Sequence, residues 1–118
     1  MEVFSWEKVR KEALNEKISR KVIWGEKITM AQLFIAKGGV VPLHHHENEQ
    51  FSSVLAGTLR FELEGQEIVA RQGDVLHIPS NVPHRVVALE DSLVLDVFSP
   101  IRADWLSGTD DYLRQGTK

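Results

Sequence analysis

Short runs that alternate apolar and polar residues, separated by turn-forming residues, recur along most of the chain. Leu59, Phe61 and Leu63 alternate with polar residues, and glycines follow at positions 65 and 73. Successive side chains of a strand point to opposite faces, so this alternation indicates a half-buried antiparallel hairpin. Such strands recur at close intervals, which predicts a β-sandwich or β-barrel.

The same pattern predicts further strands on both sides of this hairpin. Two strands surround a turn at Gly25 and Glu26 and end before Gly38. Three more strands follow the hairpin and are separated by turn-forming residues; they are predicted at residues 75–78, 85–89 and 93–98. Strands therefore dominate the expected fold.

The two ends of the chain carry helical patterns instead. Ser5 is a candidate N-cap, Glu7 stands in the expected first turn, and apolar residues follow at helical spacing. This pattern predicts one short helix over residues 5–14. Near the C-terminus, a second short helix is predicted to end at Gly108, because glycine is the usual residue at a helix end.

These elements predict a single all-β domain. Its N-terminal segment covers residues 1–17, its barrel residues 18–100 and its C-terminal segment residues 101–118. A chain of 118 residues with 42% hydrophobic residues is long enough to bury a stable core without disulfide bonds or a structural metal. Within the C-terminal segment, Asp110 and Asp111 are expected to belong to a solvated polar tail that frays at its end.

Cysteine usage and charge exclude several classes of site and partner. Without cysteine the chain offers no disulfide and no thiolate, so any metal must be held by nitrogen and oxygen atoms. The net charge is -3 and basic residues are interleaved with acidic ones, which argues against nucleic acid as a partner. No signal-peptide pattern and no apolar run near the roughly 20 residues of a membrane helix are present, so we predict no membrane partner and a cytoplasmic location.

The segment PLHHHENEQF, residues 42–51, contains candidate metal ligands. On an extended strand His44 and His46 share a face, whereas His45 points away. If the extended run continues, Gln50 shares the face of the two histidines, and the glutamates between them do not. An isolated pair of this kind is also compatible with a polar bend that simply exposes its histidines.

A further candidate ligand lies far along the sequence. His84 follows the turn PSNVP, and strands that are distant in sequence can lie side by side in a barrel. Imidazole nitrogens with a side-chain oxygen suit a divalent first-row transition metal. Protonation of such histidines is expected to release the ion in mild acid. His77, between two apolar residues, is expected to pack or to form a hydrogen bond rather than to bind metal.

Two blocks of the sequence resemble the two motifs of the cupin superfamily. In GGVVPLHHHENEQFSSVLAGTLRFEL, His44 and His46 match the histidines of the first motif, and Gln50 stands where glutamate is usual. In GDVLHIPSNVPH, His84 matches the closing histidine of the second motif, and Asn81 replaces a glycine, which is a small change because asparagine tolerates a positive φ. The resemblance implies a double-stranded β-helix, the jelly-roll barrel of small cupins. Because small cupins commonly pair, it also implies a homodimer.

The segment LVLDVFSPIRADWL resembles the corresponding stretch of the pectin-degradation cupins known as KdgF, whose first motif also has glutamine at the position of Gln50. The resemblance implies one divalent transition metal ion, and nickel, zinc, manganese, iron and cobalt are not distinguished. The implied metal ligands are His44, His46, Gln50 and His84. The implied catalytic residues are Asp96, Phe98 and Arg102.

The reaction implied by this resemblance converts 4,5-unsaturated monouronates, from pectin or alginate breakdown, into linear 5-keto-4-deoxyuronates. The implied partner is therefore a small anionic sugar. The neutral amide of Gln50 leaves the charge of a divalent ion uncompensated, which favours Lewis-acid chemistry over redox chemistry. A site that has lost its metal is a competing interpretation. Two other functions stay open: a metal-dependent cupin dioxygenase, and a noncatalytic sugar-binding or sensory cupin.

The residues of the implied catalytic trio each have a second interpretation. On the strand SLVLDVFSP, Val94, Asp96 and Phe98 share one face, so a carboxylate lies in an otherwise apolar row. Either Asp96 is paired with an arginine or with backbone donors, or burial raises its pKa toward the range useful for proton transfer. Arg102 either grips a substrate carboxylate or pairs with Asp104 at the surface. Phe98 either forms an apolar wall against the sugar or packs in the core.

Overall fold

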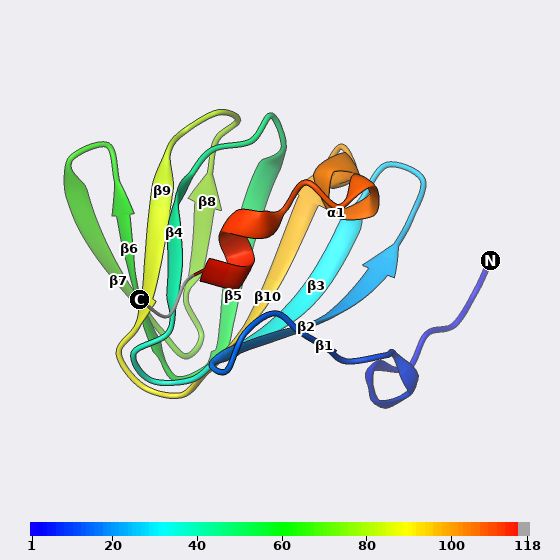
Figure 1. Cartoon of the computed structure of the whole chain (residues 1–118), viewed down its shortest axis with the longest axis horizontal. Helices are drawn as coiled ribbons and strands as arrows, with labels where there is room; N and C mark the ends of the chain where they lie inside the picture. Colours follow the sequence, from blue (N-terminus) through cyan, green and yellow to red (C-terminus); the bar gives the residue numbers. More distant parts are fainter. Residues whose placement is uncertain (116–118) are drawn as a thin grey trace.

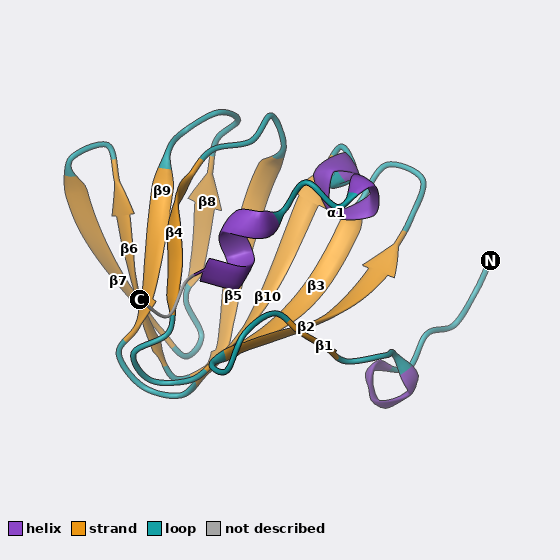
Figure 2. Ribbon diagram, viewed as in Figure 1, coloured by secondary structure: helices purple, strands orange, loops and turns teal. Residues whose placement is uncertain are grey.

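The computed structural model describes residues 1–115 as two antiparallel β-sheets (Figure 1). In chain order the strands are β1 (Glu12–Ala13), β2 (Ile18–Trp24), β3 (Thr29–Ile35), β4 (Val40–His44), β5 (Glu49–Ala56), β6 (Thr58–Leu63), β7 (Gln66–Arg71), β8 (Val75–Ile78), β9 (His84–Ala88) and β10 (Ser92–Ser99). One sheet has the order β1-β2-β3-β10-β5-β8, and the other has the order β4-β9-β6-β7. Figure 2 shows that strands form nearly all of the regular structure.

The apolar core lies between the two sheets, as the alternation of the sequence predicts. Leu59, Phe61 and Leu63 on β6 are at most 6% exposed, and they face buried residues of the six-stranded sheet such as Leu33 and Val94. The alternation therefore sorts apolar side chains inward and polar ones outward on both sheets. The predicted all-β fold, a double-stranded β-helix of the jelly-roll type, is confirmed.

The helix predicted over residues 5–14 is wrong. Only a single 3-10 turn, η1 (Trp6–Lys8), forms there, and the side chain of Ser5 caps nothing. Farther along, Glu12 and Ala13 pair with Arg20 and Ser19 as the edge strand β1. The sheet therefore begins at Glu12, ahead of the predicted start of the barrel at residue 18. An isolated helix of ten residues has little stability in water, whereas pairing with β2 satisfies backbone hydrogen-bonding groups at a sheet edge.

The predicted C-terminal helix forms as α1 (Ala103–Ser107) and ends where predicted. Gly108 adopts a left-handed conformation with φ 77°, which glycine accepts because it lacks a Cβ atom. A second helical turn, η2 (Asp111–Gln115), follows and lies against β4 (Figure 1). The C-terminal segment therefore folds back along the four-stranded sheet, next to β4.

The prediction of a solvated tail is wrong at Asp110. This side chain is 1% exposed and accepts hydrogen bonds from Arg20 and Arg114, both at 2.8 Å. Asp111 is exposed, as expected. The predicted fraying concerns residues 116–118, which lie outside the described residues. A buried ion pair with β2 therefore holds the start of η2 in place.

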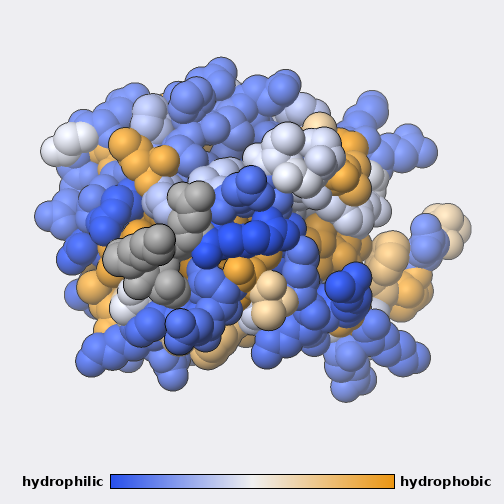
Figure 3. Space-filling view, viewed as in Figure 1, coloured by the Kyte–Doolittle hydropathy of each residue, from blue (hydrophilic) through white to orange (hydrophobic). Residues whose placement is uncertain are grey.

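The face drawn in Figure 3 is mainly hydrophilic, with apolar residues visible between the charged ones. Within residues 1–115, no helix has the length and apolar character that crossing a membrane requires.

Candidate metal and acid site

Three histidines, two of them close in sequence and one 38 residues farther along, form one cluster. His44 ends β4, His46 lies in the loop that follows, and His84 begins β9. Their candidate ligand atoms all lie within 4.8 Å of one another. The two other histidines are outside this cluster: His45 is exposed, and exposed His77 contacts Glu49 at 2.7 Å. The structure thus brings together the three histidines that the sequence singled out.

Gln50 reaches this cluster by a different route from the one the alternation assumed. The extended run does not continue from His46, because the chain bends at Glu47 and Asn48 and then enters β5 of the other sheet. Gln50 is 5% exposed, and its Oε1 atom lies 3.1 Å from Nε2 of His46. His44 and His84 on the four-stranded sheet and Gln50 on the six-stranded sheet therefore line the same pocket.

The loop before His84 is tied to the loop that carries His46. Asn81 adopts φ 62°, as expected for a residue in place of glycine, and its backbone N–H donates to the carbonyl oxygen of His46 at 2.8 Å. Asparagine tolerates this left-handed conformation better than most residues. The two loops that hold these histidines are thereby fixed relative to each other.

Backbone carbonyl groups set the orientation of all three imidazoles. The Nδ1 atoms of His44, His46 and His84 lie 2.7, 3.0 and 2.9 Å from carbonyl oxygens two residues away along the chain. A carbonyl oxygen only accepts, so each Nδ1 carries the proton and each Nε2 keeps a free lone pair. Metal-binding histidines in proteins are commonly oriented by a hydrogen bond of this kind.

Burial favours the neutral form of these histidines. It lowers the pKa of His44 to about 3 and that of His46 to about 4, and it also lowers the pKa of His84. The charge of Arg102 and the mutual repulsion of the rings add to this effect. Near neutral pH the site therefore presents three uncharged nitrogen donors, which is the form that binds metal.

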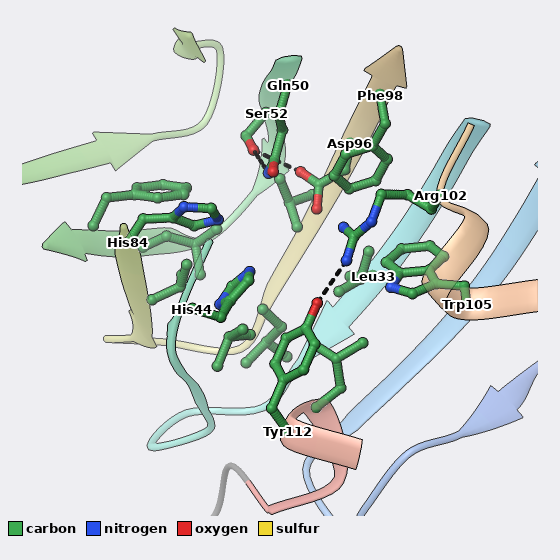
Figure 4. A pocket seen from close by; sticks show the side chains of 17 residues that line it. Leu33, His44, Gln50, Ser52, His84, Asp96, Phe98, Arg102, Trp105 and Tyr112 are labelled. Atoms are coloured by element: carbon green, nitrogen blue, oxygen red, sulfur yellow. Dashed lines mark hydrogen bonds between the residues drawn. The ribbon is translucent and has the colours of Figure 1, made fainter. Parts of the chain in front are cut away.

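A chain of hydrogen bonds sets the orientation of the Gln50 amide (Figure 4). Ser52 donates its hydroxyl proton to Asp96 at 2.6 Å, so its oxygen is left to accept from Nε2 of Gln50 at 2.9 Å. The carbonyl oxygen of Gln50 must then point toward His46. Two lone pairs at 3.1 Å repel each other unless a cation or a proton lies near them, so this donor set fits a divalent metal ion.

Asp96 lies on the inner face of β10 between Val94 and Phe98, and all three are at most 7% exposed. Within residues 1–115 the Asp96 carboxylate forms no ion pair, and Ser52 is its hydrogen-bond donor. Burial raises the pKa of Asp96 to about 6, although the hydrogen bond from Ser52 and the charge of Arg102 oppose the shift. Of the two interpretations of this carboxylate, the structure supports the perturbed acid rather than the ion pair.

Arg102 forms the pair with Asp104 that the sequence offered as one interpretation. Its Nε and Nη2 atoms donate to Asp104 at 2.9 and 2.7 Å, but this pair is not at the surface because Arg102 is 2% exposed. The guanidinium carbon lies 4.7 Å from the ring centre of Phe98, which is 2% exposed and packs in the core. Both residues line the same pocket as Asp96, His44 and His84 (Figure 4).

The sequence analysis did not assign three further residues to this pocket; one of them, Trp105, was expected in the core or at an interface and is 9% exposed. Ser52 shares the parity of Gln50 on β5, so alternation along that strand could have placed it beside the site. Trp105 and Tyr112 also line the pocket and surround Arg102. Tyr112 follows the segment interpreted as a solvated tail, and no local pattern indicates that this segment turns back into the pocket.

Comparison with known proteins places the fold and the site in context. Residues 32–98 match the Cupin_2 family of cupin domains. The pectin degradation protein KdgF of Dickeya dadantii (strain 3937) is 37% identical over 98 residues, which cover 80% of this chain and 89% of that protein.

Solved structures give the same result. KdgF from Halomonas sp. superposes with a TM-score of 0.82 at 32% identity, covering 88% of this chain and 99% of that one. An RmlC-like cupin from Shewanella frigidimarina gives a TM-score of 0.82 at 26% identity, covering 89% and 96% of the two chains. An oxalate decarboxylase of B. subtilis, at 19% identity and a TM-score of 0.74, shares the fold alone and covers 82% of this chain and 29% of that one. The chain belongs to the cupin superfamily and, within it, to the family of KdgF-like pectin-degradation cupins.

Proposed function

We propose that this protein is a metal-dependent enzyme that converts 4,5-unsaturated monouronates into linear 5-keto-4-deoxyuronates. The similarity to two KdgF proteins supports a role in the breakdown of pectin or a related polyuronate. The observation that carries the proposal is Asp96, a buried acid with a raised pKa that is linked through Ser52 to Gln50 of the candidate metal site. The proposed metal ligands are His44, His46, Gln50 and His84.

The reaction needs two proton movements and no net redox change. The anomeric hydroxyl of the unsaturated sugar loses its proton, the bond between C1 and the ring oxygen breaks with its electron pair going to that oxygen, and an aldehyde and an enolate form. The enolate then becomes the ketone when C4 receives a proton. A carboxyl group with a pKa near the working pH can accept the first proton and return a proton later, and we assign both steps to Asp96.

The other pocket residues bind and orient the substrate. Arg102 supplies cationic donors to the substrate carboxylate, and Phe98 forms an apolar wall against the sugar ring. A bound divalent ion would polarise the substrate oxygens and stabilise the negative charge that develops on them. The histidines are neutral, so such an ion and Arg102 together outweigh the negative charges of Asp96 and Asp104. That balance suits an anionic sugar.

The test follows the ultraviolet absorbance of the conjugated double bond. Unsaturated galacturonate, freshly released by a lyase, is mixed with metal-loaded protein, and the loss of absorbance is compared with the spontaneous rate. We expect a faster loss that disappears when the metal is chelated and returns when it is added back. A rate equal to the spontaneous one, with metal occupancy confirmed, would contradict the proposal.

Oxygen uptake, metal analysis and sugar binding separate the two alternatives. A dioxygenase would consume oxygen with some substrate and would contain iron or copper when isolated. A noncatalytic sugar-binding cupin would bind galacturonate without any turnover. The homodimer and the cytoplasmic location stay predictions, and light scattering of the purified protein measures the first of them.

A further inference from the structure

The C-terminal segment places the single tyrosine of the chain in the pocket. Tyr112 belongs to η2, which follows the segment matched by the cupin family at residues 32–98. Its ring stacks on that of His44, with 4.5 Å between the ring centres and 27° between the planes. Its hydroxyl accepts a hydrogen bond of 2.6 Å from Nη2 of Arg102 (Figure 4). One side chain thus contacts a candidate metal ligand and the candidate anion-binding residue.

Specific buried contacts hold this segment in place. Arg20 and Asp110 form an ion pair at 2.8 Å, and they are 4% and 1% exposed. The side-chain amide of Asn15 donates to the carbonyl oxygen of Leu113 at 3.1 Å, and Leu113 is 3% exposed within the core. A segment anchored on both sides of Tyr112 presents that side chain to the pocket in a defined orientation.

The contacts of Arg102 leave one edge of its guanidinium group for a ligand. The rings of Phe98 and Trp105 lie 4.7 and 4.6 Å from its central carbon, which restrains the plane of the group. Within that plane, Asp104 accepts from Nε and Nη2, and Tyr112 accepts from Nη2. Within residues 1–115, Nη1 has no hydrogen-bond partner. The side chain lines the pocket, so Nη1 is the donor left for a carboxylate.

We propose that Tyr112 is a positioning residue with two separable actions. Its hydroxyl holds Nη2 of Arg102, so that Nη1 stays directed at the substrate carboxylate. Its ring packs against His44 and limits rotation of that imidazole, which is otherwise oriented by the carbonyl group of Pro42. The first action rests on the proposed function, whereas the second concerns metal binding alone.

Two variants separate these actions. Tyr112→Phe keeps the ring and removes the hydroxyl, and Tyr112→Leu removes both. Ser107→Ala is the control, because it removes an exposed hydroxyl of the same C-terminal segment. Binding of saturated galacturonate, which cannot react, is measured by calorimetry. Retention of Co²⁺ is measured against a chromophoric chelator, and kcat and KM are measured with the unsaturated sugar.

The two probes have different expected outcomes. Both Tyr112 variants should bind galacturonate about tenfold more weakly and raise KM by a similar factor with little change in kcat, because a hydrogen bond to a charged group is lost. Retention of Co²⁺ should fall about tenfold in Tyr112→Leu and stay normal in Tyr112→Phe. Ser107→Ala should behave like the wild type in every measurement.

Opposite results would overturn the proposal. Wild-type affinity for galacturonate in Tyr112→Phe would exclude the action on Arg102, and equal Co²⁺ retention in all proteins would exclude the action on His44. If the wild type neither binds nor converts uronates, the proposed function fails together with the action on Arg102. The Co²⁺ experiment still decides the action on His44.

Discussion

Two aspartates of this protein are buried to a similar extent and differ in their surroundings. Asp96 is 7% exposed and accepts a hydrogen bond from Ser52, and burial raises its pKa to about 6. Asp110 is 1% exposed, yet its pKa is held below the ordinary value because hydrogen bonds from Arg114 and Arg20 outweigh the effect of burial.

The difference shows how burial alone fails to identify a functional acid. Asp110 and its arginines join η2 to β2, so its charge is compensated and its role is structural. Asp96 has no ion-pair partner within the described residues, so the effect of burial on its pKa outweighs the hydrogen bond from Ser52 and the charge of Arg102. A buried acid without a cationic partner, in a pocket with candidate metal ligands, is the kind of group that proton-transfer chemistry needs.

The largest expected effect sharpens this contrast at Asp96. Asp96→Asn should lower kcat for the unsaturated uronate by about 10²–10⁴-fold, the usual contribution of general acid–base catalysis. The free energy of unfolding should stay level or rise, because an amide costs less to bury than a carboxylate. Steady-state rates and urea denaturation measure the two quantities. A variant with normal rates would show that Asp96 is not the proton-transfer group.

The next effect should appear at Asp110, in stability rather than in chemistry. Asp110→Asn should reduce the free energy of unfolding by about 3 kcal/mol, because it leaves the buried charge of Arg20 without one of its partners. Glu62→Gln, which breaks the partly exposed pair with Arg85, is the control and should cost less than about 1 kcal/mol. Equal costs in the two variants would mean that the Asp110 pair is not the anchor we describe.

The same contrast shows how far the sequence could lead. Alternation along β10 places Asp96 on the inner face, and the spacing of His44 and His46 predicts their convergence, because both features depend on neighbouring residues. Gln50 and His84 were candidates from strand parity and barrel geometry, and the motif resemblance supported both, although the chain bends before Gln50. These predictions work where strand parity or a motif determines the direction of a side chain.

The errors concern contacts between the two ends of the chain. Asp110 was interpreted as solvated because its sequence neighbours are polar, but its partner Arg20 lies 90 residues away. The helix predicted over residues 5–14 failed for a related reason, since the edge strand β1 is stabilised by pairing with β2, which a local pattern does not reveal. Tyr112 was missed because its role depends on this same docking of the C-terminal segment.

A smaller effect is expected at Ser52, which links the acid to the metal site. Ser52→Ala removes the acceptor that fixes the Gln50 amide, so affinity for Co²⁺ should fall about tenfold, the lower end of the effect of residues that support metal ligands. Ser53→Ala is the matched control, because the neighbouring hydroxyl belongs to the opposite face of β5. Equal affinities in both variants would show that Gln50 does not need this support to face the metal.

The last expected effect is the pH dependence of the metal-free protein, where the two kinds of site titrate in opposite directions. His44 and His46 have folded pKa values of about 3 and 4, below the ordinary 6.5, so their contribution to stability is lost as the pH falls below 6.5. Asp96 has a folded pKa raised from 3.8 to about 6, so its contribution is lost as the pH rises through 6. The histidines outnumber it, and urea denaturation should show lower stability at pH 4.5 than at pH 7.

Asp96→Asn lacks the opposing group, so this variant should lose stability more steeply on acidification than the wild type. An equal slope would mean that Asp96 titrates normally. Because the histidine pKa values are lowered, the metal should also stay bound to a more acidic pH than the mild acid expected from ordinary histidines.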